Sequence, residues 1–217
     1  MQSISSPTQA RSKKALERFL NVTAELLVEN RFEDTSIAQI AQLAKSSVGT
    51  FYRLLADKDV LLYTVHERFV AQGHAAIEAM IEELKHSDQH LHAQIEFFVH
   101  GIIELFEGHE GLLRALVRRS SSDPQFRQRF HELNAYIGQT LRDIVLTHPD
   151  ELNHPQPDEA ADLAAHTLLA SMNYFTMVGT LGITPRERVP GELSHLICNY
   201  LGASPLSDDS RDAAAQG

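Results

Sequence analysis

Hydrophobic residues recur every three or four positions along almost the whole chain, a spacing typical of amphipathic helices. No segment shows the alternation of apolar and polar residues between turns that predicts a β-strand. With 43% hydrophobic residues among 217, the chain can also bury a sizeable core. The sequence therefore predicts an all-α fold. In the first predicted helix the inward face consists of Leu16, Phe19, Leu20, Thr23, Leu26 and Leu27.

Polar and turn-forming residues mark the ends of the predicted helices. Asn30 is placed to stop the first helix, and Thr35 or Ser36 to cap the second. Asp57 is placed to cap a long fourth helix. The nine helices are predicted over residues 12–29, 36–43, 47–55, 57–86, 88–107, 110–119, 123–147, 157–181 and 186–202.

Composition divides the chain into four parts. Residues 1–11 and 204–217 are predicted to be a disordered arm and tail, and residues 12–58 and 59–203 a small and a larger helical domain. No run of apolar residues is long enough to cross a membrane, and no secretory signal is present. The single cysteine, Cys198, excludes an internal disulfide and is expected to be a buried thiol. These features predict a cytoplasmic protein with no membrane partner and no cofactor.

Charge is distributed unevenly, although the chain as a whole carries a net charge of -10. Residues 1–60 hold eight Lys and Arg against seven Asp and Glu, whereas the rest holds eleven against twenty-two. Such an acidic protein does not coat nucleic acid without specificity. A contact with a polyanion is therefore expected only in the first sixty residues, where Arg11, Lys13, Lys14 and Arg18 stand close together.

Two short helices joined by a tight turn follow the first predicted helix. Such a pair, braced by a longer preceding helix, is the helix-turn-helix arrangement that places its second helix in the major groove of DNA. The second helix begins with small residues, which leave backbone N–H groups able to bind phosphate oxygens. These residues are Ser47, Val48, Gly49 and Thr50.

Gly49 is a costly residue for a helix, since glycine there is less stable than alanine by roughly 0.5–1 kcal/mol. Its missing side chain would let a DNA duplex come close. Phe51 and Leu55 share the buried face of this helix. Further DNA contacts are expected from Thr50, from the hydroxyl of Tyr52, from Arg53 at a guanine and from Lys58 at a phosphate.

The segment TSIAQIAQLAKSSVGTFYRLLADKDVLL, residues 35–62, resembles the signature of the TetR family of transcriptional regulators, T-x-x-x-I-A-x-x-A-G-V-S-x-G-T-x-Y-x-x-F-x-x-K-x-x-L. The matching positions are Thr35 or Ser36, Ile40, Ala41, Ala44, Ser47, Gly49, Thr50, Tyr52, Lys58 and Leu61 or Leu62. The resemblance implies an N-terminal three-helix helix-turn-helix DNA-binding domain, joined to a larger helical ligand-binding and dimerisation domain. It also implies DNA contacts at Thr35, Lys45, Val48, Thr50, Tyr52, Arg53 and Lys58.

Three positions depart from this signature. Lys45 replaces the glycine of the turn, Ser46 replaces the following valine, and Leu55 replaces an aromatic residue. A glycine in such a turn usually adopts a left-handed conformation, which costs a lysine on the order of 1 kcal/mol. Either Lys45 is strained or the turn is remodelled.

The resemblance also implies a small-molecule pocket and a four-helix bundle between two subunits, formed here by residues 157–181 and 186–202. The alternative for both the pocket residues and the bundle residues is ordinary intrachain core. Candidate pocket residues are Phe97, Phe98, Ile102, Phe106, Leu113, Leu116, Phe130, Tyr136, Ile137, Phe175 and Met177. Candidate dimer residues are Ala160, Ala161, Ala164, Ala165, Leu168, Leu169, Leu193, Leu196, Ile197 and Tyr200.

Two other classes of protein compete with a regulator. Twelve histidines and three Glu-x-x-His motifs, beginning at Glu83, Glu151 and Glu192, raise the possibility of a di-metal carboxylate bundle. One of these motifs, which begins at Glu151, lies in a proline-rich loop, and no catalytic motif is present. We therefore predict neither a metal site nor catalytic residues. A helical dimeric adaptor that has lost specific DNA binding is the second alternative, because of Lys45 and Ser46. The favoured hypothesis is a homodimeric repressor that binds double-stranded operator DNA and is released by an unidentified small-molecule effector.

Overall fold

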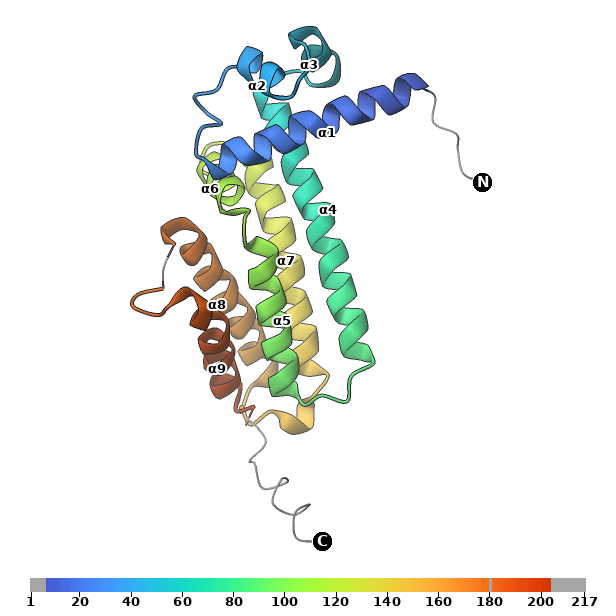
Figure 1. The fold of residues 1–217 in the computed structure, drawn as a ribbon. Coiled ribbons are helices and arrows are strands. Elements are labelled where there is room, and N and C mark those ends of the chain that lie inside the picture. Colours follow the sequence, from blue (N-terminus) through green and yellow to red (C-terminus); the bar gives the residue numbers. More distant parts are fainter. Residues whose placement is uncertain (1–6, 180, 204–217) are drawn as a thin grey trace. The chain divides into compact units, whose positions relative to one another are not determined.

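The computed structural model describes residues 7–179 and 181–203, and its regular elements in these ranges are helices (Figure 1). The one β-type pairing there is an isolated bridge between Leu181 and Thr184. The predicted all-α fold is confirmed. The helices are α1 (Pro7–Val28), α2 (Ile37–Leu43), α3 (Val48–Leu54), α4 (Lys58–Lys85), α5 (Leu91–Phe106), α6 (Glu110–Ser120), α7 (Pro124–Leu146), α8 (Pro157–Val178) and α9 (Val189–Leu201), with 3-10 turns at Pro149–Glu151 and Arg186–Arg188.

The ends of α1 test two predictions. Asn30 adopts the left-handed conformation, with φ of 56°, and the N–H groups of Asn30 and Arg31 donate to the carbonyls of Leu27 and Leu26. Asn30 therefore stops the helix as expected. The helix begins at Pro7, so the prediction of disorder over 1–11 is wrong for residues 7–11. Proline is tolerated in a first helical turn, and extending a formed helix costs little. Residues 1–6 and the predicted tail, 204–217, lie outside the described residues.

The last two helices are shorter than expected. Helix α8 ends at Val178 instead of residue 181, because Gly179 adopts a φ of 83° that a helix cannot continue through. Helix α9 begins at Val189 rather than 186, after the 3-10 turn, with Pro190 in its first turn.

The chain folds into two compact units that differ from the predicted division at residue 58. Among the described residues, the first unit contains residues 7–73 and 108–130, and the second contains 74–107, 131–179 and 181–203. Helix α6 belongs to the first unit because Gly111 packs against α1: a Cβ built at Gly111 would lie 2.0 Å from the carbonyl oxygen of Leu27. The first unit is therefore larger than a three-helix domain.

Aromatic contacts anchor the first unit. Phe19 of α1 meets Phe51 of α3 edge to face, with ring centroids 5.4 Å apart, and both rings are fully buried. Ile40 of α2 is buried with them. Burial of such side chains stabilises each by about 1.5–3 kcal/mol, which compensates for the shortness of α2 and α3.

The second unit is built on α5, α8 and α9, where α9 packs against both of the others. Cys198 is buried in α9, as predicted, and burial raises the pKa of its thiol to about 12, so the thiol remains protonated. None of the helices in the described ranges combines the length and the apolar character needed to cross a membrane.

Candidate nucleic-acid interface

Helix α2 begins with a capping box that links Ser36 and Gln39. The backbone N–H of Gln39 donates to Ser36 Oγ at 3.3 Å, and the backbone N–H of Ser36 donates to Gln39 Oε1 at 2.8 Å. Ser36, and not Thr35, is therefore the cap. This reciprocal pair stabilises the start of a helix that has only seven residues.

The turn between α2 and α3 keeps the geometry that its missing glycine would have had. Lys45 has a φ of 49°, its N–H donates to the Gln42 carbonyl at 3.0 Å, and the N–H of Ser46 donates to the Ala41 carbonyl at 2.9 Å. This pair of hydrogen bonds is the Schellman motif, which normally ends in glycine. The turn is not remodelled, and Lys45 carries the strain.

Replacing Lys45 by glycine is expected to stabilise the protein. The left-handed conformation costs a residue with a side chain roughly 1–2 kcal/mol of folded-state stability, and glycine avoids this cost. Glycine also loses more chain entropy on folding, which offsets about half of the gain. Lys45→Gly should therefore raise the free energy of unfolding by about 0.5–1 kcal/mol in urea denaturation. Lys45→Ala is the control, because it removes the same charge and keeps the strain. Equal stability of the two variants would contradict the left-handed turn.

Helix α3 buries one face and exposes the other. Ser47 caps it, accepting a hydrogen bond from the N–H of Thr50 at 3.1 Å, while the two hydroxyl groups lie 3.0 Å apart. Phe51 points into the core, whereas Tyr52 remains 56% exposed and its ring packs edge to face on Phe51. Arg53 is exposed as well. The exposed face thus presents hydroxyl groups and a guanidinium group.

Gly49 lies at the exposed start of α3, and the structure shows no intrachain reason for it. Among the described residues, and leaving aside the chain neighbours and the backbone of its own helix, a Cβ built there would meet only Ser47 Oγ, at 3.9 Å. The backbone has no left-handed φ at this position, so a side chain would fit without strain. The free space lies on the outside of the folded chain.

Two of the predicted DNA contacts are engaged within the first unit. Lys58 Nζ donates to the carbonyl oxygens of Phe32 at 2.6 Å and Glu33 at 2.9 Å, and it lies 4.6 Å from the centre of the Phe32 ring. Burial lowers the pKa of Lys58, although Glu33 opposes this effect. Thr35 is buried, and its hydroxyl donates to the Arg31 carbonyl at 2.7 Å. Both side chains shape the connection between α1 and α2.

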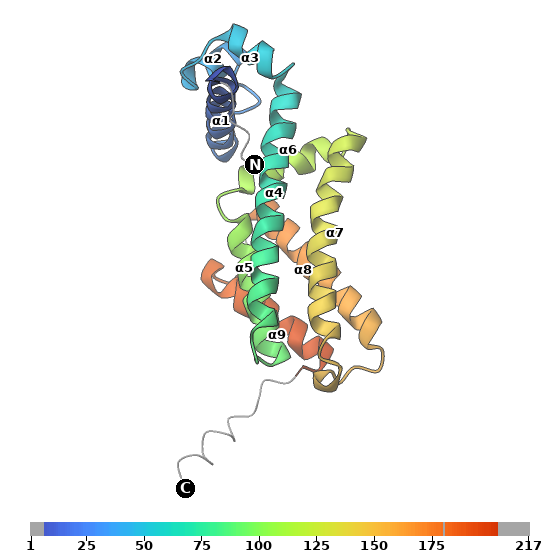
Figure 2. The same cartoon turned by 90° about the vertical axis from the view of Figure 1, so that its right-hand side faces the viewer.

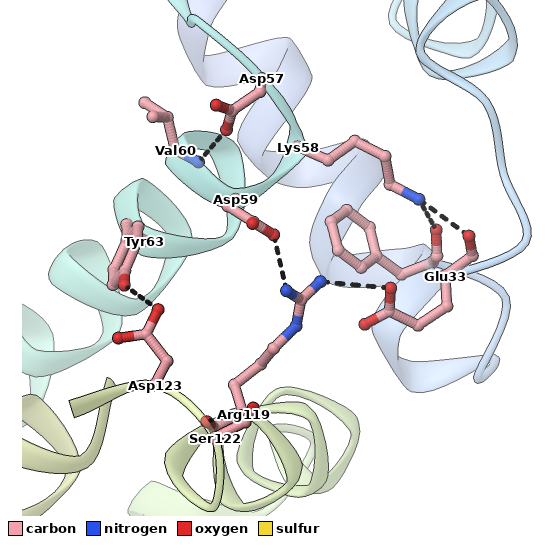
Figure 3. A network of polar contacts seen from close by, with 10 residues as sticks. Glu33, Asp57, Lys58, Asp59, Val60, Tyr63, Arg119, Ser122 and Asp123 are labelled. Carbon is pink, nitrogen blue, oxygen red and sulfur yellow. Dashed lines mark hydrogen bonds and ion pairs between the residues drawn. The ribbon is translucent and has the colours of Figure 1, made fainter. Parts of the chain in front are cut away.

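Arg119 of α6 joins the same connection, as Figure 3 shows. Its guanidinium lies 2.9 Å from Asp59 Oδ1 and 3.4 Å from Glu33 Oε2. Nearby, the hydroxyl of Tyr63 donates to Asp123 at 2.8 Å. Burial, assisted by this hydrogen bond, raises the pKa of Tyr63 to about 12. Sequence reasoning missed these residues, because residues that meet from distant parts of the chain leave no local pattern.

The electrostatic character of the α2–turn–α3 segment is uniformly non-acidic. No Asp or Glu occurs between Asp34 and Asp57, while Lys45 and Arg53 are exposed there. Neither cation forms an ion pair with any residue in the described ranges. This surface can attract an anion although the whole chain is acidic.

The predicted pocket residues divide between the two units. Leu113 and Leu116 belong to the first unit, and Phe130 is its last residue, whereas the others lie in the second. The buried members are Phe98, Ile102, Phe106, Leu113, Leu116 and Ile137, the partly buried ones are Phe97, Phe130, Tyr136 and Phe175, and Met177 is 45% exposed. The predicted set therefore contains mainly core residues.

Most of the predicted dimer residues are buried in the second unit's own core and offer little area to a partner. These are Ala160, Ala161, Ala164, Ala165, Leu168, Leu193 and Ile197. Leu169 packs near Gly138. The exposed apolar side chains lie on the neighbouring face, where a shallow groove runs between α8 and α9. Its lining consists of Leu163, Ala164, Thr167, Leu196, Ile197 and Tyr200.

No three of the histidine, cysteine, aspartate and glutamate side chains in the described ranges come together as metal ligands would.

Comparisons with known proteins fit this arrangement. The family model "Tetracyclin repressor-like, C-terminal domain" matches residues 90–201, slightly more than half of the chain. The HTH-type transcriptional regulator EthR of Mycolicibacterium smegmatis is 26% identical over 199 residues, which cover 88% of each chain. A TetR-family regulator from Mesorhizobium loti has a similar structure, with a TM-score of 0.72, 17% identity and coverage of 88% of this chain and 96% of that one. FadR of Bacillus subtilis, solved in complex with stearoyl-CoA, is also similar in structure. Its TM-score is 0.59 and its sequence identity 17%, and the match covers 88% of this chain and 99% of that one.

Proposed function

Because the chain belongs to the TetR family of transcriptional regulators, we propose that it is a repressor that binds a pseudo-palindromic operator as a homodimer and is released by a small-molecule effector. The observation that carries this proposal is the exposed start of α3, where Gly49 leaves open space beside exposed polar groups. A helix presented in this way fits the major groove.

The proposed DNA-contacting set excludes two residues that are already engaged. Lys58 and Thr35 instead hold the α1–α2 connection from which α2 and α3 are supported. Contacts to phosphates are assigned to the α3 N-terminus and to Tyr52, and contact to a base edge to Arg53. The full set is Lys45, Ser47, Val48, Gly49, Thr50, Tyr52 and Arg53.

Retardation of the DNA upstream of the protein's own gene tests this function. The wild-type protein should retard it in a salt-sensitive, sequence-specific manner. Thr50→Ala and Tyr52→Ala should each weaken binding about 10-fold. Arg53→Gln should weaken binding by about the same factor and also relax the base preference, because a good bidentate base contact contributes about 1–3 kcal/mol. Arg188→Gln is the matched control for Arg53→Gln, since Arg188 is an exposed cation of the second unit.

Two outcomes would overturn the assignment. Unchanged operator affinity of folded Thr50→Ala and Tyr52→Ala proteins would exclude α3 as the recognition helix. A wild-type homodimer that retards no upstream DNA would favour the adaptor hypothesis, in which a helical interaction protein has lost specific DNA binding.

The proposed dimer interface is the exposed stripe on α8 and α9. On α8 the residues Leu163, Thr167, Ala170, Tyr174 and Met177 are spaced by four and three positions in alternation. This spacing lets one helix pack along another. Leu163, Tyr174 and Leu196 are 53%, 56% and 53% exposed in the single chain, a large apolar area for a surface without a partner. A second copy of the chain is the proposed occupant.

Leu163→Glu combined with Leu196→Glu is expected to convert the dimer to a monomer. A charge buried without a partner costs several kcal/mol, which corresponds to at least a roughly 100-fold weaker dimer. Sedimentation velocity over a range of protein concentrations measures the change. Leu43→Glu is the control, because Leu43 is 51% exposed but lies on α2. A double variant that remains dimeric would exclude this interface.

The proposed effector is a small molecule with an apolar part that binds in the second unit. Helix α5 supplies an almost wholly apolar inner face there, with Phe98 and Ile102 fully buried. FadR of Bacillus subtilis shares the fold and was solved with stearoyl-CoA. Acyl-CoA thioesters and free fatty acids are therefore the first compounds to test for release of the operator. Release requires that the ligand prefer a conformation with low operator affinity, by the ratio of its affinities for the two states.

A further inference from the structure

Residues 9–14 of α1 lie outside the packed part of the first unit. Gln9, Ala10, Arg11, Lys13 and Lys14 are exposed, and Ala15 is the first buried side chain among residues 9–20. Figure 1 shows this end of the helix extending past α4, and Figure 2 shows it pointing towards the viewer. A helical end that buries no apolar surface gains nothing from the core of its own subunit.

This uncovered end and the turn after it carry four cations without an anionic partner. Arg11, Lys13, Lys14 and Arg18 form no ion pair within residues 7–179 and 181–203. Glu17 is the first acidic residue of the chain, and it lies 3.5 Å from Arg68 of α4. The four cations therefore keep their charge available for an anion from outside the subunit.

Helical geometry places three of these cations in one row. At about 100° per residue, Arg11, Lys14 and Arg18 lie within about 60° of one another around α1. With a rise of about 1.5 Å per residue, the row is about 10 Å long, which is enough to reach more than one phosphate of a DNA strand. Guanidinium and ammonium groups at this spacing suit a phosphate backbone.

The row is held in a fixed relation to the recognition helix. Phe19 follows Arg18 directly and packs on Phe51 of α3, with ring centroids 5.4 Å apart. The buried face of α1, which includes Phe19, and the row that includes Arg18 therefore belong to one rigid helix. A duplex that docks on α3 would have a fixed position relative to this row.

On the basis of the proposed function, we infer that the row Arg11, Lys14 and Arg18 is a second DNA-contacting element, which binds phosphates of the duplex flanking the base pairs that α3 reads. Phosphate contacts add affinity without sequence preference. They also explain how a chain with a net charge of -10 binds DNA, because these unpaired cations are gathered where the duplex lies.

The test compares the triple variant Arg11→Gln, Lys14→Gln, Arg18→Gln with the control Lys85→Gln, Arg186→Gln, Arg188→Gln, which removes the same charge from the second unit. On a long operator duplex the first variant should bind at least ~10-fold more weakly at low salt. The slope of log affinity against log salt should fall by about 0.9 for each phosphate that the variant no longer neutralises. On a duplex trimmed to the base pairs read by α3, the two triple variants should bind equally.

The readouts separate failure of this inference from failure of the proposed function. Because phosphate contacts ignore sequence, the weaker binding should also appear on a random duplex at low salt, whether or not a specific operator exists. The inference would be overturned if log affinity fell equally steeply with log salt for the two triple variants, on the long operator duplex and on a random duplex of the same length. This would hold even if Tyr52→Ala abolishes operator binding. Unchanged DNA binding together with abolished binding to anionic phospholipid vesicles would assign the row to a membrane surface and overturn it as well.

Discussion

Gly49→Leu is expected to lower operator affinity at least ~100-fold without lowering the thermal stability of the protein. Of the part of the chain that the structure describes, a Cβ at this position would meet only Ser47 Oγ, at 3.9 Å, beyond its own helix backbone and chain neighbours, so the folded chain accommodates the new side chain. Leucine also favours a helix over glycine by up to about 1 kcal/mol, which should raise the melting temperature slightly. The same side chain would occupy the space into which we expect the duplex to come, at a cost of about 3 kcal/mol or more in binding.

Paired measurements of melting temperature and operator affinity test this expectation. Gly49→Ala should give an intermediate decrease in affinity, because its side chain is a single methyl group. Gly191→Leu is the matched control, since Gly191 of α9 also has open space around it and belongs to the second unit. If Gly49→Leu binds the operator as tightly as the wild type, the start of α3 does not approach DNA, and the glycine has no explanation in the folded chain.

Local patterns in the sequence predict the features of this structure that depend on residues close together in the chain. Helical periodicity predicts the fold class, and Asn30 and the small residues around Gly49 mark a helix stop and an exposed helix start. The sequence leaves the turn at Lys45 open between strain and remodelling, since it shows a residue's preference but not the hydrogen bonds that override it. The Schellman pair at Gln42 and Ala41 decides for strain.

Contacts between distant segments cannot be predicted in the same way. Periodicity identifies an apolar face but not what covers it, so it predicts a dimer stripe on the face of α8 around Ala161 and Leu168, which the chain buries itself. Lys58 matches the family signature, yet nothing local indicates that the carbonyls of Phe32 and Glu33 bind it. The sequence predicts α6 to lie in the larger domain, whereas the structure places it in the first unit. Its contact with α1 depends on Gly111, which is distant in sequence from its partner Leu27.

Gly111→Ala is expected to destabilise the first unit by about 3 kcal/mol. The added methyl carbon would lie 2.0 Å from the carbonyl oxygen of Leu27, 2.3 Å from its carbon and 2.7 Å from the backbone nitrogen of Val28. These are backbone atoms of a helix, so no side chain can move aside, and α1 and α6 must separate. Overpacking of this kind costs typically about 1–3 kcal/mol, and a contact this short places the variant at the upper end.

Thermal and urea denaturation measure the destabilisation, and Gly191→Ala supplies the control. Gly191 lies in a helix with open space around it, so alanine there should stabilise the protein by about 0.5–1 kcal/mol. Gly111→Ala should also weaken operator binding, although residue 111 is not a proposed DNA contact, because α6 carries Arg119, which holds Glu33 and Asp59 at the base of the helix-turn-helix. Unchanged stability of Gly111→Ala would mean that α1 and α6 do not approach as closely as described, and α6 would then not belong to the first unit.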